Sequence, residues 1–133
     1  MRTVQPAPGL VNAIVYNLFI KRASPEKKEP IEIEHIISED TELGFANGLR
    51  AISTPGHTAG HLVFLWPQQG GVLFVGDAAT RFLGLGYPPI FEDMAEGRRS
   101  LQKMAALGFE VACFSHGKAM VGGAAGVFRK KWG

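Results

Sequence analysis

The most informative segment is Thr54-Pro55-Gly56-His57-Thr58-Ala59-Gly60-His61, which lies between two apolar runs. Pro55 and Gly56 favour a turn there, because proline fixes φ and glycine admits backbone conformations that other residues avoid. We therefore expect His57 to project from the end of a strand, a rigid position that suits a metal-binding imidazole. Two alternatives remain: a helical zinc pair of His57 and His61, which the proline and glycines disfavour, and loop histidines satisfied by backbone hydrogen bonds.

Two further segments place a potential ligand directly after an apolar strand. Asp77 follows Val72–Gly76, and His116 comes soon after Val111–Phe114. Taken singly, Asp77 also suits a turn or helix cap, and a lone histidine is more often structural. Together His57, Asp77 and His116 form a chemically sensible zinc set, and strand ends are where sites on α/β sheets gather.

Cys113 lies three residues before His116, a spacing that raises the possibility of a thiol nucleophile with a base. On a strand, side chains three apart point to opposite faces, so the two should diverge. We interpret Cys113 as a small buried apolar residue.

The N-terminal third of the chain predicts one helix and a hairpin. Apolar residues from Val11 to Phe19 recur with helical spacing, and this helix should end before Pro25. The charged residues 24–30 indicate a loop. Ile31 and Ile33 alternate with glutamates, which is typical of a half-buried strand. Asn47-Gly48 predicts a hairpin turn, with a return strand from Leu49 to about Thr54.

The remainder predicts an α+β arrangement in a single domain that covers residues 1–133. Leu62–Trp66 and Val72–Val75 form a second hairpin, and Asp93 with Glu96 forms a capping box that opens a helix ending near Gly108. Val111–Phe114 is a buried strand candidate, and residues 124–132 favour a short closing helix. Helices and hairpins without regular βαβ alternation indicate a mixed chain; the family resemblance described below implies a mostly antiparallel sheet with helices on one face.

Composition excludes several classes of protein. The formal net charge of +2 is too small to indicate a nucleic-acid partner, and the basic Arg129–Lys131 is expected to be a solvated tail. A single cysteine permits no internal disulfide. The first ten residues lack the apolar run of a signal peptide, and no stretch is apolar enough to span a bilayer. We therefore expect a cytoplasmic protein without a membrane partner.

From about Ile31 to Ala125 the chain resembles the metallo-β-lactamase superfamily, and within it the glyoxalase II-like hydrolases. The matching motifs are TPGHTAGH at Thr54–His61, FVGD at Phe74–Asp77 and SHG at Ser115–Gly117. The resemblance implies that His57 binds a first metal, that Asp77 bridges two metals and that His116 binds the second. His61 matches a position that supports the site without binding metal.

The sequence departs from the family in lacking its His-x-His-x-Asp-His motif, since the only other histidine is His35, interpreted as a surface residue. The resemblance thus implies the C-terminal half of an αββα sandwich, with the first half's metal loop missing. Zinc would be under-ligated, because each of two metals would have at most two of the three ligands. The catalytic residue that handles the proton of the attacking water cannot be assigned.

Three interpretations of function follow. The chain is a metal-dependent hydrolase of esters or thioesters whose site is completed by another chain, a non-catalytic binding or structural module, or a fragment of a full-length enzyme. Without the first half, the inner face of the sheet, with Leu62, Phe64, Val72 and Phe74, would be exposed, which predicts a two-fold homodimer. Phe82 and Tyr87 in the glycine-rich loop Arg81–Pro89 are candidates to line a pocket for an unidentified small-molecule substrate.

Overall fold

The computed structural model describes residues 4–21 and 30–133. Its centre is a six-stranded sheet with the strand order β2-β3-β4-β5-β7-β8. Neighbouring strands are antiparallel except β5 and β7, which run parallel and are linked through a helix. The strands are β2 (Thr41–Leu43), β3 (Leu49–Ser53), β4 (Leu62–Trp66), β5 (Val72–Gly76), β7 (Val111–Phe114) and β8 (Met120–Val121).

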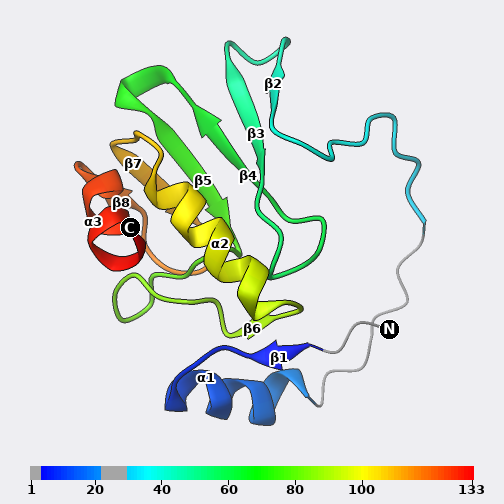
Figure 1. Ribbon diagram of the computed structural model, residues 1–133, viewed down its shortest axis with the longest axis vertical. Helices are drawn as coiled ribbons and strands as arrows, with labels where there is room; N and C mark the ends of the chain where they lie inside the picture. Colours follow the sequence, from blue (N-terminus) through cyan, green and yellow to red (C-terminus); the bar gives the residue numbers. More distant parts are fainter. Residues whose placement is uncertain (1–3, 22–29) are drawn as a thin grey trace.

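Two helices cover one face of this sheet, while a third helical segment lies beyond its end (Figure 1). The covering helices are α2 (Met94–Ala105) and α3 (Ala124–Trp132). At the far end, α1 (Leu10–Val15) continues as the π-helical η1 (Tyr16–Ile20). The short β1 (Gln5–Pro6) pairs with β6 (Ile90–Phe91), and a 3₁₀ turn, η2 (Gln68–Gly70), joins β4 to β5.

The core lies between the sheet and its two helices. Strand register places Leu65 opposite Leu73, and Leu73 opposite Ala112, so that one row of side chains faces the helices. Both Leu73 and Ala112 are fully buried, as are Met104 of α2 and Phe128 of α3. Burying each large apolar side chain contributes roughly 1.5–3 kcal/mol, so this layer holds the helices to the sheet.

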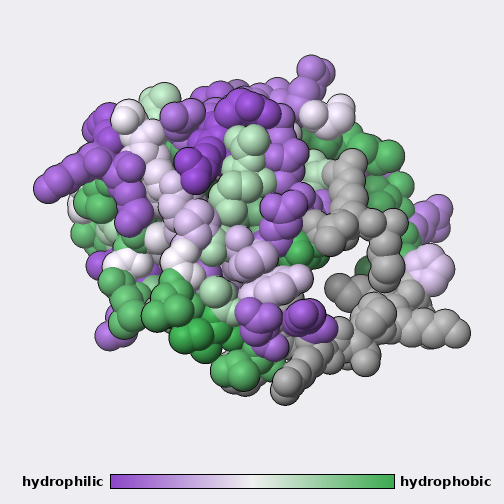
Figure 2. All heavy atoms as spheres, turned by 60° about the horizontal axis from the view of Figure 1, so that its bottom comes forward, coloured by the Kyte–Doolittle hydropathy of each residue, from purple (hydrophilic) through white to green (hydrophobic). Residues whose placement is uncertain are grey.

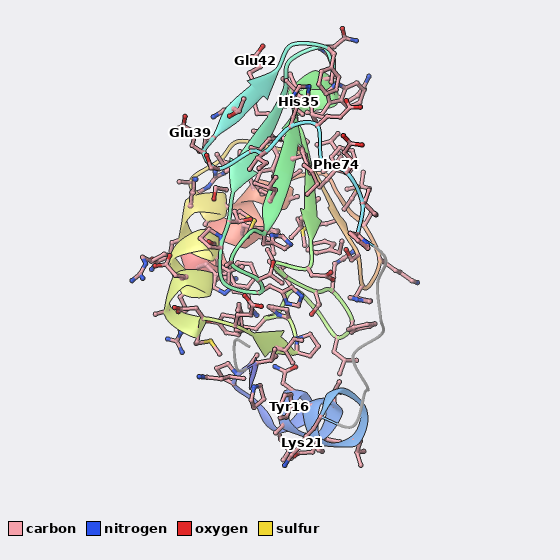
Figure 3. The ribbon with its side chains drawn as sticks, turned by 90° about the vertical axis from the view of Figure 1, so that its right-hand side faces the viewer. Tyr16, Lys21, His35, Glu39, Glu42 and Phe74 are labelled. Carbon is pink, nitrogen blue, oxygen red and sulfur yellow. The ribbon has the colours of Figure 1, made fainter. Side chains whose placement is uncertain are left out.

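The opposite face of the sheet has no helix layer in the described part of the chain. Figure 3 shows Phe74 on the side away from α2 and α3. We call this surface the open face; it carries exposed or half-buried side chains of alternate residues, namely Leu62, Phe64, Trp66, Val72, Phe74, Val111, Cys113 and Val121. Phe74 is 43% exposed and Val121 is 79% exposed. Cys113, predicted to be buried, is half-buried because it belongs to this face.

Most predicted elements are confirmed. The two hairpins, the closing helix and the capped helix are present, and the Asp93 side chain accepts a hydrogen bond from the Glu96 amide. Asn47 and Gly48 both have positive φ, as the hairpin prediction requires, although the loop that joins Leu43 to Leu49 is longer than two residues. The basic Arg129–Lys131 is exposed but belongs to α3, not to a tail.

One predicted strand is absent. No strand forms at Ile31–Glu34; this segment is irregular, and Ile31 and Ile33 are 85% and 70% exposed, because no described strand pairs with it. The helix predicted from Val11 is confirmed, and its helical residues end at Ile20, before Pro25. The predicted loop 24–30 lies almost wholly outside the described residues.

Several apolar side chains of the first helical segment are exposed to solvent. Leu10, Ile14 and Leu18 are 78%, 48% and 53% exposed. Figure 2, in which this end of the molecule is turned forward, shows apolar atoms gathered along the edge where α1 lies. In the parts of the chain that the structure describes, no helix is long and apolar enough to cross a membrane.

Candidate metal centre

The Thr54–His61 turn lies against the start of α2. The Gly56 carbonyl accepts hydrogen bonds from the amides of Glu92 (2.8 Å) and Asp93 (3.0 Å), and the Ser100 hydroxyl donates to the Pro55 carbonyl at 2.7 Å. Gly56 has φ +140°, and a Cβ there would lie 2.3 Å from the Gly97 Cα. Only glycine fits this approach, so the turn is fixed by direct backbone contact with the helix.

In His57, which belongs to that turn, one ring nitrogen makes a hydrogen bond to the backbone. Its Nδ1 lies 3.1 Å from the Ile90 carbonyl oxygen of β6. A carbonyl only accepts, so Nδ1 carries a proton, and in the neutral tautomer the lone pair is on Nε2. Metal-ligating histidines are commonly oriented by such a bond from the other nitrogen. This orientation of the His57 ring suits a ligand that binds through Nε2.

His61 has both ring nitrogens engaged by the protein. Its Nε2 accepts the Asp77 amide N–H at 3.2 Å, and its Nδ1 lies 3.0 Å from the Thr54 hydroxyl. Nδ1 must then carry the proton and donate to Thr54. Burial lowers the His61 pKa, as does the charge of His57, while Asp77 acts in the opposite direction. The neutral ring thus orients the Asp77 backbone, an arrangement that suits the supporting role inferred for it.

Asp77 and His116 meet at the ends of the parallel strands β5 and β7. The Asp77 Oδ1 lies 3.3 Å from the His116 Nε2. Two ligands at zinc distances of about 2.0–2.2 Å and tetrahedral angles lie about 3.4 Å apart. The observed separation suits two ligands of one metal ion as well as it suits an ion pair. The amide of Ser115 also donates to the Gly76 carbonyl at 3.1 Å, which ties the two strand ends together.

The structure brings together two of the three predicted ligands but not all three. Within residues 4–21 and 30–133, no group of three histidine, cysteine, aspartate or glutamate side chains is placed to hold a metal ion. His57 and His61 are neighbours, with ring centroids 6.0 Å apart. The residues present therefore fit part of a zinc site. His35 is exposed on the segment before β2, as predicted (Figure 3).

The loop that follows Asp77 borders the site. Phe82 stacks on His116 with ring centroids 6.0 Å apart, and the Arg81 amide donates to the His116 carbonyl at 3.0 Å. Phe82 lines a cavity, as proposed from the sequence. Tyr87 does not share that cavity, because its ring packs against Phe91 and Trp132.

Several contributors to the site escaped prediction. Nothing in the sequence marks the Ile90 carbonyl that orients His57, or the Ser100 hydroxyl that holds the turn. Both are distant in sequence, and backbone acceptors leave no signature in residue type. Thr54 carried a signal, since it belongs to the motif, but its bond to His61 required the fold.

Comparisons with known proteins give a consistent result. The family model of the metallo-beta-lactamase superfamily matches residues 8–116. A beta-lactamase-like protein 2 homolog from Caenorhabditis elegans is 37% identical over 89 residues, which are 66% of this chain and 28% of that protein. A hydroxyacylglutathione hydrolase from Bartonella tribocorum is 34% identical over 95 residues, or 70% of this chain and 36% of that protein.

A solved structure agrees with these relatives. An archaeal metallo-beta-lactamase superfamily protein from Sulfolobus tokodaii superimposes with a TM-score of 0.54 at 26% identity, covering 92% of this chain and 48% of that one. The chain thus spans about a third of its curated relatives and about half of this structural neighbour. With a family model matched over most of its length, the chain belongs to the metallo-β-lactamase superfamily.

Proposed function

We propose that this chain carries part of the metal centre of a zinc-dependent hydrolase acting on esters or thioesters. One observation supports it above the others: Asp77 and His116, at two adjacent strand ends, present Oδ1 and Nε2 at 3.3 Å. That spacing matches two zinc ligands, and the free Nε2 of His57 lies in the same region of the fold. Two relatives at 34% and 39% identity are named hydroxyacylglutathione hydrolases, which favours a thioester substrate.

Each residue has a role in this proposal. Asp77 and His116 are ligands of one metal, His57 is a ligand of a second, and His61 orients Asp77 by accepting its amide N–H. When bound, zinc supplies Lewis acidity that makes water nucleophilic near neutral pH. The rigid turn at Gly56 and the bond from His57 to Ile90 keep the ligands in place before the metal arrives.

Each metal needs more protein ligands than these residues supply. A catalytic zinc takes about three protein ligands and an open position, and Asp77 with His116 supplies two. The sequence holds four histidines, and none belongs to a His-x-His-x-Asp-His motif. We propose that the remaining ligands come from a partner chain and that the isolated chain is inactive or nearly so.

Zinc titration of the purified chain tests this proposal. We expect binding weaker than the ~10–16 kcal/mol of structural zinc sites, because too few ligands are present. Asp77→Ala and His116→Ala should abolish it, while the matched control His35→Ala, which removes an exposed histidine outside the site, should leave it unchanged. Equal zinc binding by wild type and Asp77→Ala would disprove the assignment. Tight binding of one or more zinc ions per chain would disprove the proposal that the metal centre lacks ligands.

A second candidate function is favoured by the open face. Its apolar side chains, Phe74 and Val121 among them, are exposed as in a protein that binds another protein. We propose in this case a non-catalytic module that forms a homodimer through the open face. Absence of zinc binding together with a stable dimer in sedimentation would favour this function over hydrolysis.

A further inference from the structure

A cavity of about 480 Å³ lies at the β2 edge of the sheet, on the side of the open face. Its walls come from β2, from the segment before it, from the loop after it and from one side chain of β4. Large apolar side chains form most of this lining, namely Ile36, Ile37, Leu43, Phe45 and Phe64. Because Phe45 is 85% exposed and Phe64 belongs to the open face, the cavity is an apolar hollow that solvent can enter.

The opposite edge of the sheet carries an apolar projection. Val121 of β8 is 79% exposed and pairs with Val111, which in turn pairs with Val72. At the other edge Leu43 pairs with Leu49, and the antiparallel register of β3, β4 and β5 connects that level to Val72. Paired residues point to the same face of a sheet. Val121 and Leu43 therefore lie at one level, on one face and at opposite edges.

This placement makes the open face complementary to itself. Two sheets that pair face to face through a two-fold axis have that axis between them, either along the strands or across them. An axis along the strands places the β2 edge of one copy over the β8 edge of the other and keeps residues of one level together. Val121 of each copy then faces the cavity of the other. Stacked sheets lie about 10 Å apart, so their side chains interdigitate.

Charge favours the same arrangement. Residues 30–49 contain five carboxylates and no lysine or arginine, whereas residues 114–122 contain Lys118 and no carboxylate. Glu39 and Lys118 are exposed, and each comes two residues before its edge strand, at the end where β3 and β7 finish. Figure 3 shows Glu39 and Glu42 on the β2 side of the sheet. An axis along the strands sets Lys118 against Glu39, whereas an axis across them sets two acidic edges against each other.

We propose that the open face binds a second copy of this chain about a two-fold axis along the strands, with Val121 of each copy in the apolar cavity of the other. Lys118 of each copy faces Glu39 of the other at the rim of this contact. Both contacts occur twice in the dimer, because a two-fold interface uses the same surface of both copies.

The pairing has a consequence for the proposed metal centre. His57, Asp77 and His116 come after β3, β5 and β7, and these three strands run in one direction. An axis along the strands brings the corresponding ends of both copies to one end of the dimer. The inference rests on the proposed function in this respect alone, since it names the second copy as the partner chain that supplies the remaining ligands.

Sedimentation velocity of the metal-free chain tests the charged contact. Lys118→Glu and Glu39→Lys should each raise the Kd of the dimer by about threefold or more, because each opposes like charges at two equivalent contacts. The chain with both changes should return to within about twofold of the wild-type Kd, because the attraction is restored with its signs exchanged. Arg98→Glu is the matched control on the exposed side of α2, and combined with Glu39→Lys it should restore nothing.

Cross-linking tests the cavity contact. In a Cys113→Ser background, a Ser38→Cys chain and a Val121→Cys chain are mixed and treated with a short bismaleimide, since Ser38 lines the cavity. We expect a product that joins the two different chains and little product from either chain alone. Links between two Val121→Cys chains, a charge exchange that restores nothing, or a monomeric wild type would overturn the proposal. Zinc takes no part in these measurements, so a dimer of this form that binds no zinc supports the pairing and contradicts only the proposed metal centre.

Discussion

At the scale of single residues, His61 is the side chain whose chemistry the structure specifies most fully. Its Nε2 accepts from the Asp77 amide, so its neutral form must carry the proton on Nδ1. We predict this tautomer near pH 7.5, observable from the ring nitrogen shifts. We also predict that His61→Gln lowers zinc affinity about tenfold, since loss of such supporting partners typically costs 10–100-fold. A proton found on Nε2 would contradict the assignment.

Gly56 gives a second prediction, about stability. Its φ of +140° and its approach to Gly97 leave no space for a methyl group. We predict that Gly56→Ala destabilises the fold by about 1–3 kcal/mol through backbone strain and overpacking. Gly60→Ala is the matched control in the same turn, because a Cβ there would contact nothing within 4 Å. Urea denaturation should separate the two; equal midpoints would show that the turn adapts.

The motif residues were predictable because their types carry the chemistry. His57, Asp77 and His116 each come after a strand, and the structure places Asp77 beside His116, while no group of three potential ligands gathers in the described residues. The sequence does not show which ring nitrogen of His57 or of His61 carries the proton. That depends on the Ile90 carbonyl and the Asp77 amide, and backbone groups look the same at every position.

At the scale of elements, a polar contact joins β3, α2 and the segment before β2. The Asp40 Oδ1 accepts from the Lys103 Nζ at 2.7 Å and from the Ser53 amide at 3.0 Å, and Lys103 also donates to the Ser53 carbonyl. Burial acts to raise the Asp40 pKa, but the bonds from Lys103 and Ser53 outweigh it and hold the pKa below 3.8.

Because the folded pKa of Asp40 is depressed, its stabilisation is complete above pH 3.8 and disappears as pH falls through the lower folded value. We predict that Asp40→Asn lowers stability by about 0.2–1 kcal/mol at pH 7, as expected for a half-exposed pair. The difference from wild type should shrink below pH 3.8. Denaturation curves at pH 7, 5 and 3 measure it, and a difference that grows toward pH 3 would refute the explanation.

Local pattern predicted elements better than it predicted their partners. The Asp93 cap and the hairpins were found because their signals lie within a few residues. The alternation at Ile31 and Ile33 is as regular as in strands that do form, yet no described strand pairs with this segment and both side chains are exposed. A periodic pattern predicts which face of a strand is apolar. The strand itself forms only where a neighbouring strand supplies backbone hydrogen bonds.

At the scale of the whole molecule, two apolar surfaces lack partners in the described chain. One is the stripe of α1 and the other is the open face. The helix-covered face of the sheet could be predicted from sequence, because the apolar face of the strands packs against the apolar faces of amphipathic helices. The open face was expected from the lack of a His-x-His-x-Asp-His motif, and the chain covers 48% of the solved structure that it resembles.

Association through the open face is the prediction that belongs to this scale. The sheet edges are poor docking sites, because β2 has three residues and β8 has two. The open face is broad and apolar, and a two-fold pairing would bury the same surface of both copies. We therefore predict a dimer at micromolar concentration in sedimentation velocity, which Phe74→Asp should convert to monomer by placing a charge in the buried contact.

Val127→Asp provides the control for this dimer prediction. Val127 lies on α3 and is 43% exposed, the same fraction as Phe74, but it belongs to the helix that covers the opposite face of the sheet. A general effect of added charge on solubility or association would change both variants alike, whereas pairing through the open face changes only Phe74→Asp. A monomeric wild type, or equal dimers of all three proteins, would show that another partner or another surface accounts for the exposed apolar side chains.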